Sequence, residues 1–100
     1  MRGHLMKLFL FATHRGMTRF IFALDEQKAS DLFTLDLVLT AAEPSRFWHQ
    51  EFPLLRVIEP HRARLREALA LQLEGIGVYR EEDGWSIYAV GECPDGDRGT

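Results

Sequence analysis

The chain has 100 residues, of which 46% are hydrophobic and 27% charged, a composition typical of one folded domain and unlike that of a disordered chain. Its formal net charge of -3 excludes a global positive field that would attract nucleic acid or an anionic membrane. One cysteine, Cys93, leaves no intramolecular disulfide and suits a reducing cytoplasm. No apolar run approaches the roughly 20 residues that a membrane-spanning helix requires, so no membrane partner is expected.

Residues 6–24 contain two segments rich in Phe, Ile and Leu on either side of a turn at His14, Arg15 and Gly16. These residue types favour strands, and a glycine readily adopts the positive φ that a short hairpin loop requires. The pattern predicts an antiparallel β-hairpin.

A helix is predicted over residues 26–41. Asp25 is suited to cap its N-terminus, and Glu26 complements the helix dipole. Residues 33–40 also alternate apolar and polar side chains, which is typical of a strand. The alternative is therefore a helix that stops near Leu32 and a strand after it.

A short helix over residues 46–51 is predicted next, between a capping Ser45 and the helix-terminating Pro53. In such a helix Trp48 and Phe52 lie four residues apart on one side, where they would anchor the segment against the sheet. This interpretation predicts a buried Trp48.

The same segment contains the third functional hypothesis, a small-ligand pocket or an enzyme site around Trp48, His49 and Glu51. His49 and Glu51 share one side only if the segment is extended, because side chains alternate along a strand. In the short helix they lie far apart, and His49 is then expected to matter little for folding.

Residues 54–58 are short and apolar and are predicted to form a brief strand or an extended connector. Pro60, at a first helical position, opens the clearest helix, which is expected to stop at Gly75. Its apolar face is expected to consist of Leu65, Ala68, Leu69, Gln72 and Leu73.

Residues 76–90 are predicted to form a second hairpin, with its tight turn at Asp83 and Gly84. Residues 92–100 are predicted to be a flexible tail, so that residues 1–91 form one domain. The order of hairpin, helix, short helix or strand, helix and hairpin predicts a small two-layer α+β domain with a mainly antiparallel sheet.

Apolar side chains occupy both faces of the predicted hairpins, and Tyr79 and Tyr88 are expected on the face opposite Trp85. Two helices can cover one face well, and the other would then expose a larger apolar patch than monomers usually do. We therefore expect a second copy or another protein to cover it. The residues expected at this interface are Phe9, Phe11, Ile21, Ala23, Tyr79 and Tyr88.

Four arginines are the one local basic feature and the candidate contacts to nucleic acid or another anion: Arg56, Arg62, Arg64 and Arg66. On a helix, Arg62 and Arg66 share one side while Arg64 lies apart, and glutamates interrupt the stripe. Because non-specific nucleic-acid binding relies on several phosphate contacts, only weak binding is predicted.

The histidines, carboxylates and nucleophiles match no catalytic, metal-binding or phosphate-binding spacing, so no catalytic residue, metal or cofactor is predicted. The function favoured by the sequence is that of a small non-enzymatic cytoplasmic protein that works through protein–protein contact, as a homodimer or an adaptor subunit. The alternative is a nucleic-acid-associated accessory protein that uses the arginine-rich helix.

Overall fold

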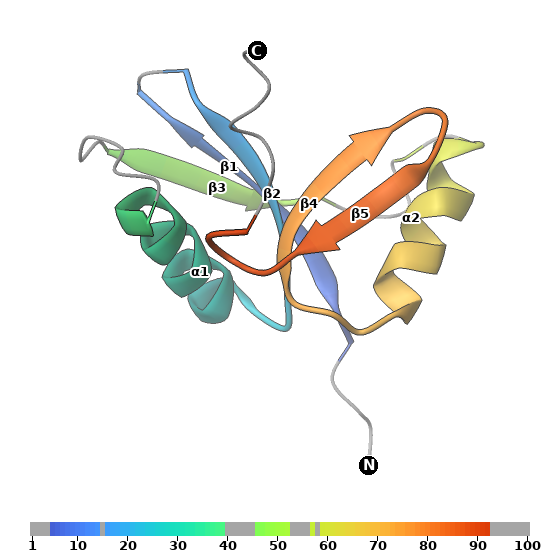
Figure 1. Ribbon diagram of the computed structural model, residues 1–100, viewed down its shortest axis with the longest axis horizontal. Coiled ribbons are helices and arrows are strands. Elements are labelled where there is room, and N and C mark those ends of the chain that lie inside the picture. Colours follow the sequence, from blue (N-terminus) through green and yellow to red (C-terminus); the bar gives the residue numbers. More distant parts are fainter. Residues whose placement is uncertain (1–4, 15, 40–45, 53–56, 58, 93–100) are drawn as a thin grey trace.

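The computed structural model describes residues 5–14, 16–39, 46–52, 57 and 59–92. The elements in chain order are β1 (Lys7–Thr13), β2 (Thr18–Ala23), α1 (Glu26–Leu39), β3 (Phe47–Glu51), α2 (His61–Ala70), β4 (Gly75–Arg80) and β5 (Gly84–Tyr88). The strands form one antiparallel sheet in the order β3-β1-β2-β4-β5 (Figure 1). The predicted α+β class, both hairpins and the antiparallel pairing are confirmed. Residues 93–100 of the expected tail lie outside the described residues.

The first hairpin closes as its sequence predicts. The Thr13 N–H donates to the Met17 carbonyl oxygen at 2.9 Å, which closes the four-residue connection, residues 14–17, between the strands. Gly16 has a φ of 88°, in the left-handed region that favours glycine.

The helical interpretation of residues 33–39 is confirmed, because α1 continues to Leu39. The Asp25 carboxylate accepts a hydrogen bond from the Lys28 N–H at 2.8 Å, which caps the N-terminus of the helix. The alternation of apolar residues arises because α1 buries Phe33 and Leu37 on one side and exposes Leu35 and Leu39 on the other. The last predicted helical residues, 40 and 41, lie outside the described residues.

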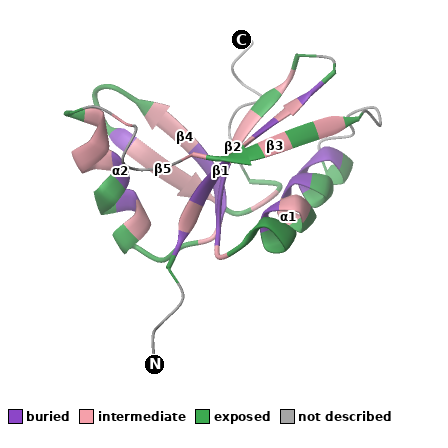
Figure 2. Cartoon of the chain, turned by 180° about the vertical axis from the view of Figure 1, so that it is seen from behind, coloured by how far each residue is buried: buried purple, intermediate pink, exposed green. Residues whose placement is uncertain are grey.

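The two helices cover opposite faces of the sheet, and Figure 2 shows them at opposite sides of the molecule. Phe9, Phe11 and Ile21 face α1 and pack with Phe33, while the alternate side chains face α2. The α2 side contains Met6, Leu8, Phe22, Leu65 and Ala68. The expectation that both helices share one face, which led to an uncovered second face, is therefore wrong.

The predicted short helix over residues 46–51 is also wrong, since residues 47–51 form strand β3. This strand pairs with β1 over its whole length, from Thr13 opposite Phe47 to Phe9 opposite Glu51. The pairing supplies backbone hydrogen bonds to a distant part of the chain, which outweighs the local preference for a helix. Most of the predicted connector, residues 54–56 and 58, lies outside the described residues.

Helix α2 is shorter than predicted. It begins at His61, directly after Pro60, but ends at Ala70. Gln72 then adopts a φ of 58°, and Gly75 is the first residue of β4 rather than the helix stop. Leu65 and Ala68 are buried and Leu69 is partly buried, whereas Leu73 is 49% exposed because it follows the end of the helix.

No helix of the described residues is long and apolar enough to cross a membrane.

Candidate binding pocket

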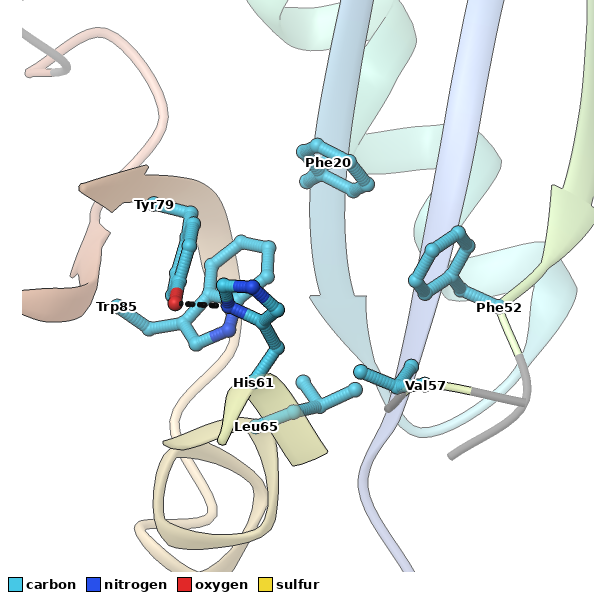
Figure 3. Close-up of a pocket in the computed structure, with 7 residues that line it drawn as sticks. All are labelled: Phe20, Phe52, Val57, His61, Leu65, Tyr79 and Trp85. Atoms are coloured by element: carbon cyan, nitrogen blue, oxygen red, sulfur yellow. Dashed lines mark hydrogen bonds between the residues drawn. The ribbon is translucent and has the colours of Figure 1, made fainter. Parts of the chain in front are cut away.

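A pocket of about 290 Å³ lies between α2 and the sheet face that it covers. The residues that line it come from β2, from positions 52 and 57 between β3 and α2, and from α2, β4 and β5: Phe20, Phe52, Val57, His61, Leu65, Tyr79 and Trp85 (Figure 3). None of the seven is a lysine, arginine, aspartate or glutamate. The pocket is therefore an apolar, largely aromatic recess with a few polar atoms.

Strand register and helical spacing explain why these residues meet. Tyr79 and Trp85 are directly opposite each other in β4 and β5, so their side chains lie on the same side of the sheet. His61 and Leu65 are four residues apart and share the side of α2 that faces them. The register corrects the expectation that Tyr79 and Tyr88 share the face of the sheet away from Trp85, because Tyr79 lies on the same face as Trp85.

The aromatic rings hold one another at steep angles. The Trp85 ring meets the Phe20 ring edge-on, with centroids 5.2 Å apart and an angle of 88° between the planes. It meets Phe22 in the same way at 5.3 Å and 87°. Phe20 also has an edge contact with Phe52, at 5.7 Å and 77°. Edge-to-face pairs are a favourable geometry for aromatic rings, so these contacts fix the orientation of the pocket walls.

Gly77 in β4 makes room for this arrangement. A Cβ atom at Gly77 would lie 2.6 Å from Cε1 of Phe22 and 3.0 Å from Cζ3 of Trp85. Any other residue would push at least one of these rings away from the strand. The absence of a side chain at Gly77 therefore lets Trp85 lie close to the sheet.

The pocket contains one polar pair. Nδ1 of His61 and the hydroxyl oxygen of Tyr79 are 2.6 Å apart and hydrogen bonded. Figure 3 shows the His61 ring among the lining side chains, with Tyr79 on one side and Phe52 on the other. The pair places hydrogen-bonding atoms in otherwise apolar surroundings, where a hydrogen bond is electrostatically stronger than in water.

The residues expected at a dimer interface are mostly inside the chain. Phe11, Ile21 and Ala23 are 0% exposed and Phe9 is 1% exposed, because α1 covers them. These four side chains are therefore not on the surface of the monomer. Tyr79 lines the pocket and Tyr88 lies on the other side of the sheet, so the structure does not bring the six residues into one surface. The homodimer itself stays a prediction.

Trp48 is not a buried anchor. Trp48 is 55% exposed, and its ring meets the His14 ring edge-on, with centroids 5.6 Å apart. His49 points to the opposite side of β3, where its ring stacks on Phe11 at 5.0 Å and 18°. Because Trp48 and His49 face opposite ways in a strand, the structure does not bring them into one pocket. Glu51 shares the side of His49, as expected for an extended segment.

The arginines of the predicted anion site have separate environments. The Arg62 Nε–H donates to the Val57 carbonyl oxygen at 2.8 Å, and its Nη1 lies 3.9 Å from Glu59. Arg64 lines a recess with Gly84 at the second hairpin turn, while Arg66 is exposed. Arg56 lies outside the described residues. Arg62 and Arg66 share one side of α2 by their spacing, Arg64 lies at the hairpin turn, and nucleic-acid or anion binding stays a prediction.

No three His, Cys, Asp or Glu side chains within the described part of the chain are placed to hold a metal ion.

The chain matches no protein-family model, no curated protein and no solved structure. Functional inference therefore rests on the pocket and on the exposed surfaces. The sequence analysis did not predict this pocket. The one local indication of it was a pair of aromatic residues, Tyr79 and Trp85, on either side of the turn of the second hairpin.

Proposed function

We propose that the chain is a non-enzymatic, cytoplasmic binding protein and that its aromatic pocket takes up the apolar part of a small molecule. The observation that carries this proposal is the pocket of about 290 Å³ lined by Phe20, Phe52, Trp85 and four further residues. Small-molecule sites begin at about 300 Å³ and are mainly apolar with a few placed polar groups. The single cysteine supports the cytoplasmic location.

The chemistry of the lining supports binding rather than catalysis. It contains no serine, cysteine or carboxylate beside His61 that would serve as a nucleophile or a second acid–base group. Its apolar area favours ligands that gain by leaving water, at about 25 cal/mol per Å² of apolar surface.

Toluene tests the proposal, because it is a small apolar probe. A ligand that binds only the folded chain raises its thermal stability, so saturating toluene should raise the melting temperature. The variant Val57→Phe should fill the pocket and remove the shift. The control Val38→Phe makes the same change at a residue of α1 that is 67% exposed. In this variant toluene should still raise the melting temperature. No shift in the unmodified chain at saturating toluene would contradict the proposal.

Protein–protein contact, through a homodimer or an adaptor role, is the second candidate function. Leu35, Val38 and Leu39 are 46%, 67% and 54% exposed and share one side of α1. The only charged residue in the last two turns is Asp36, which is buried and paired with Arg19. An uncharged apolar stripe of this kind favours contact with another protein.

We predict that the partner is a second copy, because two-fold homodimers are the commonest oligomers. Light scattering coupled to size exclusion should then report about twice the chain mass of 11.5 kDa. The variant Val38→Glu should yield a folded monomer. A monomer of the unmodified chain at several micromolar would contradict this second candidate and leave the pocket proposal untouched.

A further inference from the structure

The hydrogen bond between His61 and Tyr79 has two arrangements, because neutral imidazole carries one N–H and one lone pair. In the first, the Tyr79 hydroxyl donates to Nδ1, which leaves the Nε2–H as a donor and the Tyr79 oxygen as an acceptor. In the second, the Nδ1–H donates to the Tyr79 oxygen, so that the hydroxyl becomes a donor and Nε2 an acceptor. In either arrangement of this 2.6 Å pair the Tyr79 hydroxyl remains open to a third group, as an acceptor in the first and as a donor in the second, while Nε2 points away from it on the other side of the ring.

The walls of the pocket favour a planar ring over an aliphatic chain. Phe20, Phe52 and Trp85 already meet at angles of 77° and 88°, and an aromatic guest would extend this edge-to-face array. An aliphatic guest would gain burial but not the additional attraction between ring edges and ring faces.

The lining also disfavours an ionised guest. Its seven residues include no lysine, arginine, aspartate or glutamate that could compensate a charge. An ion would lose its hydration without an opposite charge, which is far more costly than burying a neutral polar group that finds a hydrogen-bond partner.

We propose that the pocket selects a neutral aromatic molecule bearing one group that both donates and accepts hydrogen bonds, such as a hydroxyl, with the His61–Tyr79 pair as its partner. This inference rests on the proposed function, since it specifies the ligand of the same pocket. The hydroxyl of the ligand would hydrogen bond to the Tyr79 oxygen, as a donor in the first arrangement and as an acceptor in the second, which is why a group that can do both is selected.

Three probes of one shape test the inference: toluene, p-cresol, which adds a hydroxyl, and p-toluate, which adds a charge. Each is titrated into the full chain, and the indole N–H resonance of Trp85 is followed by NMR, with Trp48→Phe used to assign it. We expect p-cresol to bind about fivefold more tightly than toluene, because one neutral hydrogen bond contributes about that factor. We expect p-toluate to bind more weakly than either.

Tyr79→Phe removes the hydroxyl and keeps the ring, so the affinity for p-cresol should fall to that for toluene. Tyr88→Phe is the matched control on the other side of the sheet and should preserve the fivefold preference. Equal affinities of the unmodified chain for toluene and p-cresol, or tighter binding of p-toluate, would overturn this inference and leave the proposed function standing. Failure of all three probes to bind would overturn both.

Discussion

The two faces of the sheet use the same kinds of residue with different results. On the face toward α1, Phe11 stacks on Phe33 with centroids 4.7 Å apart, and the core residues are almost completely buried. On the face toward α2, Phe20, Phe52 and Trp85 meet at steep angles and are only partly buried. The pocket therefore lies among partly buried rings of the α2 face, whereas the rings named on the α1 face are closely packed.

Two features of the chain explain the difference. Helix α1 has 14 residues and packs Phe33 against both Phe11 and Phe47, whereas α2 has only 10 residues and its largest buried side chain is Leu65. In addition, β4 presents Gly77 to the α2 side, which leaves space that aromatic rings from neighbouring strands fill incompletely. Incomplete packing of a sheet face is therefore the origin of the proposed binding site.

The largest expected effect is at the α1 face. Phe11→Ala should lower the free energy of unfolding by about 3 to 5 kcal/mol, because a fully buried ring leaves a cavity. Phe52→Ala, at the half-buried pocket wall, should cost less than about 2 kcal/mol. Urea denaturation of both variants measures the difference. Equal losses would mean that the two faces are equally well packed.

A buried ion pair also belongs to the α1 face. Nε of Arg19 lies 2.8 Å from Oδ2 of Asp36, whose side chain is 1% exposed. Arg19→Met removes this cation from a buried carboxylate and should cost about 3 kcal/mol. The double variant Arg19→Met/Asp36→Leu removes both charges of the buried pair. In denaturation experiments it should recover much of the free energy of unfolding that Arg19→Met loses. A double variant no more stable than Arg19→Met would contradict this reading.

A moderate effect is expected at Gly77. The Cβ of Gly77→Ala would overlap the rings of Phe22 and Trp85, so the variant should lose about 1 to 3 kcal/mol of stability through overpacking. The Trp85 indole resonance should move and toluene binding should weaken. Ser86→Ala, in the adjacent strand but on the other side of the sheet, is the control and should change neither. An unaltered Trp85 resonance in Gly77→Ala would show that Gly77 does not shape the pocket.

The smallest effects distinguish the two sides of β3. Trp48→Ala should change stability by no more than about 0.5 kcal/mol, as is usual for exposed residues. His49→Ala should cost about 1 kcal/mol, because it removes the stacking of His49 on Phe11. Thermal or urea melts compare the two. A larger loss for Trp48→Ala would restore the buried anchor that the sequence predicted.

Local sequence patterns predicted the hairpins and α1 well. Phe, Ile and Leu around Gly16 define the first hairpin without reference to distant residues, and Asp25 marks the start of α1. Strand β3 could not be recognised in this way, because Ser45 and Pro53 favour a local helix. What makes residues 47–51 extended is their pairing with β1, more than thirty residues away in the chain.

The pocket was beyond local patterns for a similar reason. Gly77 looks like an ordinary strand residue until Phe22 and Trp85, from two other strands, are placed beside it. His61 and Tyr79 are hydrogen bonded across 18 positions of sequence. The uncovered sheet face expected from the sequence was wrong, because alternation along a strand shows that both faces are apolar but not which helix covers each. The homodimer itself stays a prediction.

The most direct test is to locate bound p-cresol by NOE contacts between its protons and those of the protein. Binding in the pocket predicts contacts to Trp85, Phe52 and Leu65 and none to Phe11 or Phe33, which lie under α1. Contacts confined to the exposed stripe of α1, at Leu35, Val38 and Leu39, would contradict the proposal that the incompletely packed face is the binding site.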